Sequence, residues 1–276
     1  MPEGDTIYRL AQQITQTFGG REIVAFQTIE PHLARDDMAG RHLERANAEG
    51  KNLFIEFSGG LTLHSHLQML GKWKIERPAR NDALERAGER VHGEYRPAQL
   101  RLIAEHASLL ALHLRILKWA KPREVKRVSE RLGPDLLAED YSEAEAVTHL
   151  RSAADECIAI ALLRQDLVAG IGNVFKSEVL FLQGIHPLTP VAQLSDGALV
   201  TLLGKTRELM RRNTLSGPRK TRFALGGPRL WVYEREGERC LRCGARIAMQ
   251  RLGPKLRSTY HCPVCQPERT SAVPPQ

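Results

Sequence analysis

The first 18 residues carry apolar side chains at the spacing of an amphipathic helix. From Glu3 to Phe18 the apolar positions recur every three or four residues, so one face of a helix can pack against a core. These positions are Ile7, Leu10, Ala11, Ile14 and Phe18. Pro2 is then expected directly ahead of this helix.

Short segments with strand character follow and are separated by glycines and polar residues. The segments are REIVAFQTI, NLFIEF, LTLHSHL, KWKI, QLRLIAE and SLLALHL. They predict a mostly β domain of about 115 residues, within the usual size range of domains. Residues 77–97 are polar and charged with little periodicity, so we expect a long loop there.

The pattern becomes helical over residues 140–213 and predicts three helices. The first is marked by the core-facing positions Leu150, Ile158, Ala161 and Leu162. The second runs from Asn173 to Leu182 and the third from Asp196 to Arg212. The sequence AGIGN between the first two predicts a tight glycine turn with Asn173 as helix N-cap. Residues 121–139 are charged and contain two prolines, which suits an interdomain hinge.

The overall charge narrows the class of partner. The chain has 40 Lys and Arg against 32 Asp and Glu, a net charge of +8. This balance favours a polyanionic partner over an acidic small molecule. The chain opens with the acidic MPEGD and has no run of 18 apolar residues, so we expect a cytoplasmic protein without membrane segments.

Four of the five cysteines form two CxxC pairs near the C-terminus. Cys240 and Cys243 are followed, after an 18-residue gap, by Cys262 and Cys265. In a reducing compartment this spacing indicates one tetrahedral structural zinc ion with no open coordination position. Chance pairing and a redox motif are the alternatives.

The residues between the two pairs are expected to form a β-hairpin. Such a ribbon would project Lys255 and Arg257 outward, where a guanidinium can bind a phosphate. As an alternative, Arg257 is only a solvated surface charge.

The segment QDLVAGIGNVFKSEVLF carries a second candidate site. Its glycines let the backbone approach a ligand, Asn173 opens a helix, and exposed amides at a helix N-terminus bind phosphate. Lys176 lies one turn into that helix. The alternative is an ordinary helical hairpin whose glycines serve only the turn.

Pro2 is a candidate nucleophile. Methionine is normally removed before a small second residue, which would leave Pro2 as an N-terminal secondary amine that is partly neutral at about pH 7. Such an amine can attack the C1′ carbon of a sugar and form an iminium, while Glu3 protonates the ring oxygen and shuttles protons. As an alternative, Pro2 is only a permissive residue at helix position N1.

Two segments of the β domain carry further candidates. Lys51 stands at the entry of a strand, where its charge can face a phosphate or the reacting sugar. Gln68, Met69 and Leu70 end another strand, and an exposed tip of this kind can wedge into a base stack. The alternatives are an ordinary surface lysine and core residues at a strand end.

Together these features resemble the formamidopyrimidine-DNA glycosylase and endonuclease VIII family over nearly the whole chain. The matching motifs are MPEG, EGKNL, the GIGN turn with its upstream Gln165, and RSTYHCPVCQ. Four motifs in this order, with a four-cysteine finger last, are highly specific. The resemblance implies an α+β multidomain fold with an N-terminal β-sandwich and its leading helix, a helix-two-turn-helix α domain and a C-terminal zinc-finger β-hairpin.

The expected domain limits follow from the pattern and the resemblance. We expect a catalytic β-sandwich at 1–120, a hinge at 121–139, a helix-two-turn-helix DNA-binding domain at 140–228, a zinc finger at 229–267 and a disordered tail at 268–276. The implied partner is double-stranded DNA with damaged bases or abasic sites, bound by a monomer.

The resemblance implies roles for the candidate residues, because each of them occupies a position that has a known role in the family. Pro2 is similar to the family's Schiff-base nucleophile and Glu3 to its acid and base partner. Lys51, Asn173 and Arg257 match residues that hold the phosphates flanking the lesion. We expect Lys51 and Arg257 to serve catalysis as well.

Two features of the sequence bear on the substrate: the tip at residues 68–70 and a departure from the family pattern at Thr6. Gln68, Met69 and Leu70 fall where endonuclease VIII fills the gap left by the everted nucleotide, although its third residue is aromatic. Thr6 stands where many members carry a glutamate that helps arrange the base-release site. Cleavage at an existing abasic site is therefore better supported than base excision.

The PEGD opening and the QML tip resemble the endonuclease VIII branch. This implies removal of oxidised pyrimidines and strand cleavage by β,δ-elimination. Three alternatives stay open: a glycosylase for 8-oxoguanine-type or formamidopyrimidine purines, an abasic-site lyase with weak base excision, and a catalytically inactive zinc-finger DNA-binding protein.

Overall fold

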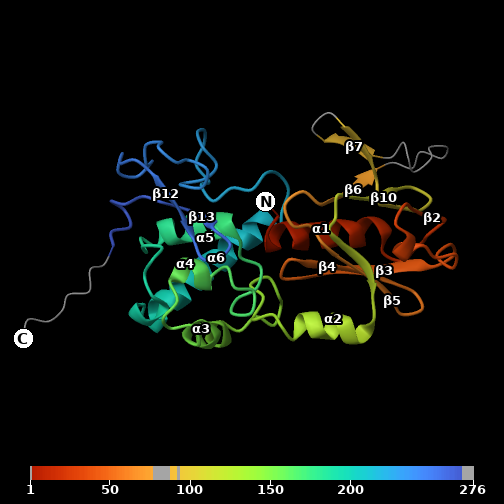
Figure 1. Cartoon of the computed structure of the whole chain (residues 1–276), viewed down its shortest axis with the longest axis horizontal. Helices are drawn as coiled ribbons and strands as arrows, with labels where there is room; N and C mark the ends of the chain where they lie inside the picture. The colour runs from red at the N-terminus through yellow and green to blue at the C-terminus, as the bar shows by residue number, and fades with distance from the viewer. Residues whose placement is uncertain (1, 77–87, 92–93, 269–276) are drawn as a thin grey trace, which may run out of the picture. The chain divides into compact units, whose positions relative to one another are not determined.

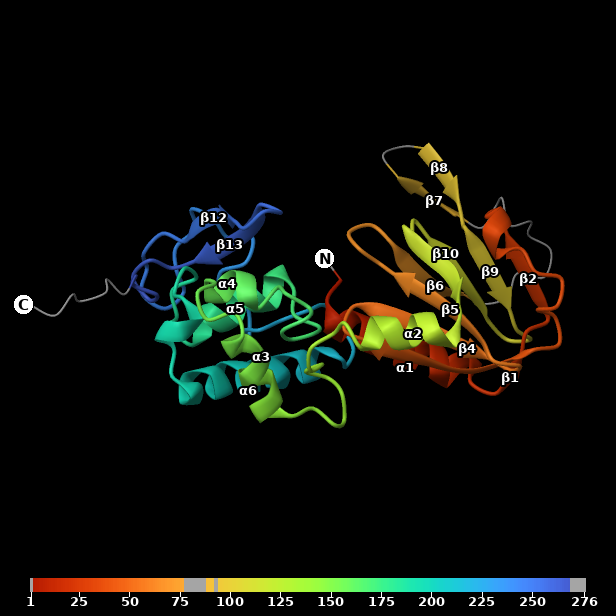
Figure 2. The same cartoon turned by 60° about the horizontal axis from the view of Figure 1, so that its bottom comes forward.

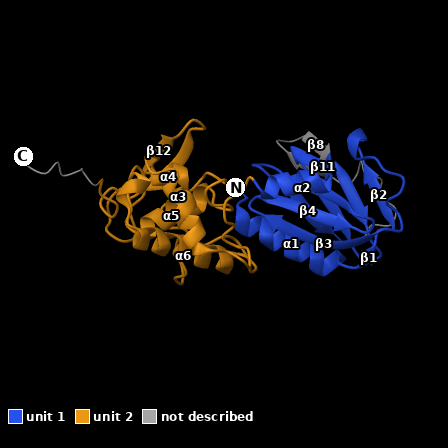
Figure 3. Cartoon of the chain, turned by 90° about the horizontal axis from the view of Figure 1, so that it is seen from below, with its two compact units in different colours: residues 1–130 blue, residues 131–276 orange. Residues whose placement is uncertain are grey.

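The structure is a computed structural model that describes residues 2–76, 88–91 and 94–268. It divides into two compact units, residues 1–130 and residues 131–276 (Figure 3). The boundary falls inside the segment 121–139 that we expected to be a hinge. Of the tail expected at 268–276, all but residue 268 lies outside the described residues.

The first unit opens with the helix that the sequence predicts. Helix α1 (Gly4–Phe18) packs on β3 (His42–Glu49) and β4 (Asn52–Phe57) (Figure 1). Thr15 fastens the helix to β3, because its Oγ1 accepts a 2.8 Å hydrogen bond from the amide of Ala46. The apolar face of α1 is buried in the core, at Ile7, Ala11, Ile14 and Phe18.

A five-stranded antiparallel sheet has the order β1-β3-β4-β5-β11. Its other strands are β1 (Arg21–Glu22), β5 (Leu61–His66) and β11 (Ile116–Ala120). The sequence analysis missed β3 and β11. In β3, whose sequence is HLERANAE, the buried residues are Leu43 and Ala46, so the strand lacks the alternation that marks a half-buried strand.

A four-stranded antiparallel sheet has the order β2-β9-β10-β6. Its strands are β2 (Ala25–Thr28), β6 (Lys72–Glu76), β9 (Leu100–Ile103) and β10 (Ser108–Leu112). The single strand predicted in REIVAFQTI is therefore two strands, β1 and β2, on different sheets. The change of sheet occurs at Ile23 and Val24, whose amides bond to the carbonyls of Arg41 and Ile103.

Both sheets and α1 share one hydrophobic core, which confirms the predicted β-sandwich. In β10, Leu109 and Ala111 belong to this core, while Leu110 and Leu112 pack with Ala98 in a second cluster. Because successive residues of a strand point to opposite faces, both faces of β10 are buried. The continuous apolar sequence of this strand is the result.

Two segments expected to be irregular contain regular structure. Within 77–97, β7 (Gly88–Val91) and β8 (Glu94–Pro97) pair as a hairpin (Figure 2). Residues 77–87 and 92–93 of that expected loop lie outside the described residues. Within the expected hinge, α2 (Pro122–Ser129) begins at a proline, which suits the first turn of a helix. A short 3-10 helix, η1 (Pro31–Leu33), follows β2.

The second unit is helical before it reaches the cysteines. Its helices are α3 (Glu143–Arg151), α4 (Ile158–Ala161), α5 (Asn173–Leu182), the 3-10 helix η3 (Val191–Gln193) and α6 (Asp196–Asn213). Helices α5 and α6 confirm the second and third predicted helices. The predicted first helix is wrong as a single element, because the chain turns over residues 152–157 and divides it into α3 and α4.

Two strands, β12 (Ala248–Leu252) and β13 (Arg257–His261), form the antiparallel hairpin predicted between the cysteine pairs. Helix α5 packs against β13 (Figure 1). Among the helices of the described residues, none is long and apolar enough to cross a membrane.

Candidate functional site

Pro2 precedes the first helical residue, Gly4, by two positions, and Glu3 occupies the N-cap position between them. The N1 position of α1 therefore belongs to Gly4, so the helix-initiation alternative does not account for Pro2. Met1 lies outside the described residues.

Glu3 is fully buried at the N-terminus of α1. Its carbonyl accepts the amides of Thr6 and Ile7 at 2.9 and 3.2 Å, which fixes the first turn of the helix. The positive end of the helix dipole stabilises a negative charge at this position. The helix that follows thus fixes the backbone of Glu3, the residue next to Pro2.

Lys51 lies in the turn between β3 and β4, directly ahead of the first residue of β4, as the sequence predicts. The turn depends on Gly50, whose φ of 57° is a left-handed value that a side chain disfavours. Asn52 closes the turn, because its Nδ2 donates a 3.1 Å hydrogen bond to the carbonyl of Glu49.

His64 holds Asn52 from the neighbouring strand. Its Nε2 lies 3.0 Å from Asn52 Oδ1, and its ring stacks on Phe54 with centroids 4.7 Å apart. Burial is the main cause that lowers the pKa of His64 to about 4, and the charge of Lys118 adds to it. A neutral, buried histidine therefore supports the turn that carries Lys51.

The Gln68–Leu70 tip, residues 68–70, connects β5 to β6. Met69 and Leu70 are 61% and 69% exposed, so they are not core residues. Gln68 has a φ of 51°, which places it in the left-handed region. The structure thus supports an exposed, conformationally defined tip over the alternative of buried strand-end residues.

Gln165 shapes the glycine turn ahead of α5. Its Oε1 accepts the amide of Gly170 at 3.0 Å, and its Nε2 donates to the carbonyl of Ile171 at 3.1 Å. Gly172 occupies the N-cap position and Asn173 is the first helical residue, so the prediction of Asn173 as N-cap is displaced by one residue. Asn173 is buried.

Lys176 does not lie where the sequence analysis expected a phosphate-binding side chain. It is fully buried, and its Nζ donates to Thr259 Oγ1 at 2.7 Å and to the carbonyl of Ser258 at 2.8 Å. The helix turns this face toward β13 and away from solvent. Its role as a direct DNA contact is therefore corrected: Lys176 fastens α5 to the hairpin that carries Arg257.

Glu178, two residues further along α5, is a structural residue that the sequence analysis missed. Its buried carboxylate accepts the amides of Trp231, Val232 and Tyr233, each at 2.8 Å, and the hydroxyl of Thr221. Burial raises the pKa of this carboxyl, while the hydrogen bonds act in the opposite direction. A charge within the apolar sequence VFKSEVLF was the available signal.

Arg257 is the first residue of β13 and is half-buried. Among the residues that the structure describes, its guanidinium has no hydrogen-bond or ion-pair partner, so its donors are available to a ligand. Lys255, in the turn of the same hairpin, is exposed. The hairpin therefore presents basic side chains as predicted.

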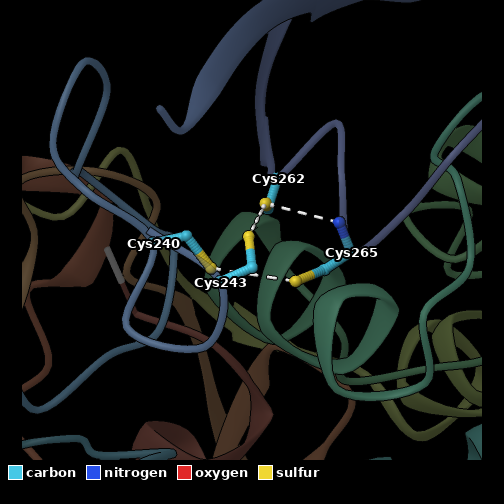
Figure 4. Close-up of side chains that lie close together, drawn as sticks. All are labelled: Cys240, Cys243, Cys262 and Cys265. Atoms are coloured by element: carbon cyan, nitrogen blue, oxygen red, sulfur yellow. Dashed lines mark hydrogen bonds between the residues drawn. The ribbon is translucent and has the colours of Figure 1, made fainter. Parts of the chain in front are cut away.

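The four cysteines predicted to bind metal come together at the base of this hairpin. Their sulfur atoms all lie within 4.8 Å of one another and point toward a common centre (Figure 4). Two Sγ–Sγ distances are 3.4 and 3.9 Å. Tetrahedral zinc with Zn–S bonds of about 2.3 Å requires sulfurs about 3.8 Å apart.

Backbone amides support the cysteine cluster. The amide of Arg242 donates to Cys240 Sγ at 3.4 Å, and the amide of Cys265 donates to Cys262 Sγ at 3.5 Å. Such bonds favour thiolates. The donor set Cys240, Cys243, Cys262 and Cys265 fits a four-coordinate metal ion.

The predicted site residues thus fall into two groups. Pro2, Glu3, Lys51 and the Gln68–Leu70 tip belong to the first unit, and the residues of α5, the hairpin and the cysteine cluster belong to the second. In the second unit the structure brings Lys176 to the hairpin and the four cysteines to one another.

Comparison with known families covers both units. Residues 1–116 match the formamidopyrimidine-DNA glycosylase N-terminal domain, and residues 132–223 match the formamidopyrimidine-DNA glycosylase H2TH domain. The chain is similar to a solved structure of formamidopyrimidine-DNA glycosylase from Lactococcus lactis non-covalently bound to DNA with an abasic site. The TM-score is 0.78 at 25% identity, over 96% of this chain and 100% of that one.

Curated relatives match over almost their full length. A probable endonuclease 8 2 of Streptomyces coelicolor is 37% identical over 96% of this chain and 94% of the relative. A DNA-(apurinic or apyrimidinic site) lyase of Mycolicibacterium smegmatis is 33% identical over 96% of this chain and 99% of the relative. The chain therefore belongs to the formamidopyrimidine-DNA glycosylase and endonuclease VIII family of DNA glycosylases and abasic-site lyases, on its endonuclease VIII branch.

Proposed function

We propose that the protein excises oxidised bases from double-stranded DNA and cleaves the strand at the resulting abasic site, with Pro2 as nucleophile. The observation that carries this proposal is the arrangement at the start of α1. Pro2 lies outside the helix and is not needed to begin it, while the adjacent Glu3 is buried at the helix N-terminus. Family membership supports the same reaction class.

The reaction begins once removal of Met1 frees the Pro2 nitrogen. This nitrogen attacks C1′ of the damaged nucleotide, and the glycosidic bond breaks with its electron pair going to the base, which takes up a proton. Glu3 accepts the proton released from the nitrogen and gives it to the ring oxygen O4′. The sugar ring opens and an iminium links Pro2 to C1′.

Strand cleavage follows from this iminium. Loss of a proton from C2′ expels the 3′ phosphate, and a second elimination expels the 5′ phosphate. Water then hydrolyses the remaining iminium, which releases the unsaturated sugar fragment as an aldehyde and restores the free amine of Pro2. These steps are the β,δ-elimination that the resemblance implies.

The substrate would be held by phosphate contacts and by filling of the gap in the base stack. Lys51, Asn173 and Arg257 are the proposed phosphate-binding residues, and Lys176 supports the hairpin from within. Everting a nucleotide costs a few kcal/mol of stacking, which the Gln68–Leu70 tip partly replaces. Oxidised pyrimidines are the proposed substrates because of the endonuclease VIII branch.

A single zinc ion is the proposed occupant of the cysteine cluster. With all four positions filled by thiolates it supplies structure only, because no coordination position stays open for water or substrate. The hairpin, with Arg257 at the start of β13, would depend on it.

Trapping the imine tests the proposal. We expect borohydride to link the protein covalently to a duplex with an abasic site, and Pro2→Gly to reduce this adduct strongly. A duplex with a tetrahydrofuran analogue, which has no C1′ carbonyl, is the matched control. A protein that binds the abasic duplex without forming an adduct would instead be a DNA-binding protein without catalytic activity.

The lesion preference needs a separate panel. Nicking of duplexes with thymine glycol, 5-hydroxyuracil and 8-oxoguanine is compared with nicking of the abasic duplex. We expect the two oxidised pyrimidines to be cleaved faster than 8-oxoguanine. Cleavage of the abasic duplex alone would identify a lyase that releases bases poorly, as Thr6 suggests.

A further inference from the structure

His66, the last residue of β5, contacts the backbone of the Gln68–Leu70 tip. Its Nδ1 accepts a 3.1 Å hydrogen bond from the amide of Gln68. Gln68 is the residue with the left-handed backbone, at φ 51°. Because a non-glycine residue in this region carries a conformational cost, a specific contact is needed to hold it there.

The opposite end of the tip is fixed by a backbone hydrogen bond and by close packing. The amide of Gly71 bonds to the carbonyl of Leu67 at 2.9 Å, which closes the turn. A Cβ at Gly71 would lie 2.6 Å from that carbonyl oxygen and 2.7 Å from Leu114 Cδ2, so the backbone here is tightly packed. The start of the tip, at Gln68, is the part that depends on His66.

The hydrogen bond also defines the state of the imidazole ring. An Nδ1 that accepts from an amide carries no proton, so the neutral ring has its proton on Nε2. Burial, with a further contribution from the charge of Lys51, lowers the pKa of His66. The environment of His66 therefore favours the neutral form, which is the form able to accept this bond.

We propose that His66 is a positioning residue: through Nδ1 it holds Gln68 in its left-handed conformation and so presents Met69 and Leu70 to the gap in the base stack. This inference rests on the proposed function, because it assigns the tip to gap filling. His66 acts through the backbone of Gln68 and needs no contact with the reacting sugar.

Two amide substitutions separate the nitrogen atoms of His66. His66→Asn keeps an acceptor oxygen at the position of Nδ1, whereas His66→Gln keeps a polar group near the position of Nε2 and loses the acceptor near the backbone. The duplex contains a tetrahydrofuran abasic analogue opposite 2-aminopurine, whose fluorescence reports how the gap is filled. Met69→Ala serves as the control that the signal comes from the tip, and thermal unfolding checks that each variant is folded.

We expect His66→Asn to retain the fluorescence response and its DNA affinity within about twofold, and His66→Gln to lose about tenfold in affinity together with the response. Equal behaviour of the two variants, whether both intact or both impaired, would overturn the inference, since the role would then not depend on Nδ1. The analogue cannot react with Pro2, so this result is independent of the chemistry. Failure of imine trapping by the wild-type protein would overturn the proposed function instead.

Discussion

The buried Nζ of Lys176 donates a 2.7 Å hydrogen bond to Thr259 Oγ1 and thereby ties α5 to β13 within the second unit. Lys176→Met removes this bond and leaves the carbonyl of Ser258 without that donor. We expect the free energy of unfolding to fall by about 2 kcal/mol, because buried acceptors in Ser258 and Thr259 lose their donor. Denaturant unfolding measures this change.

Salt dependence of DNA binding separates the buried Lys176 from the half-buried Lys51. Each phosphate contact contributes about one to the slope of log affinity against log salt. Lys51→Met is therefore expected to lower the slope by about one, while Lys176→Met leaves it unchanged. An equal decrease in both variants would restore Lys176 as a direct phosphate contact.

Glu178→Ala is expected to loosen the segment that follows α6. The substitution leaves the amides of Trp231, Val232 and Tyr233 without their acceptor, which should cost about 1–3 kcal/mol for each amide that stays unsatisfied. Hydrogen exchange of these three amides should become faster. Glu178→Gln is the milder control, since one oxygen can still accept, and unchanged exchange in the alanine variant would contradict the assignment.

His64 makes the stability of the first unit depend on pH. Its pKa is about 4 in the folded protein against an ordinary value of 6.5, so below pH 6.5 the unfolded chain binds the extra proton. The stabilisation is complete above pH 6.5 and is lost as the pH falls from 6.5 to 4, by up to about 3 kcal/mol. Urea unfolding at several pH values should show this loss, and His64→Phe should flatten the curve in that range.

Metal removal should act on the hairpin and not on the β-sandwich. Cys240 and Cys262 belong to the same small buried cluster as Phe181, Val232 and Ile247, so the metal site and the core of the module are one structure. A strong chelator is expected to weaken DNA binding while the first unit stays folded. Added zinc should restore binding, and full affinity after complete metal removal would contradict the prediction.

The sequence predicted α1, α5 and the cysteine cluster because each depends on local spacing. Helical periodicity defines α1 and α5, and the CxxC pairs bring their own geometry. The sequence analysis missed the strand β3, because contacts with α1 and β4, and not an alternating pattern of its own, hold it in the sheet. Its polar sequence carries little of that information.

Site residues show the same limit. The resemblance gave positions for Pro2, Glu3 and Lys51, but no spacing rule separates a buried lysine from an exposed one. Lys176 is buried because its acceptors, in Ser258 and Thr259, lie 82 and 83 residues further along the chain. Such a partner becomes visible only in the folded unit.

In the tip between β5 and β6, the residues that fix the backbone are not the residues whose side chains are exposed. Its backbone course is set by residues on either side of it, the imidazole at position 66 and the glycine at position 71. The exposed side chains at 69 and 70 are thereby free to vary in size and polarity without remodelling the loop. Replacing them with the side chains of a relative should therefore make the protein fill the vacated base position as that relative does. The two positions can be exchanged while the surrounding backbone stays the same.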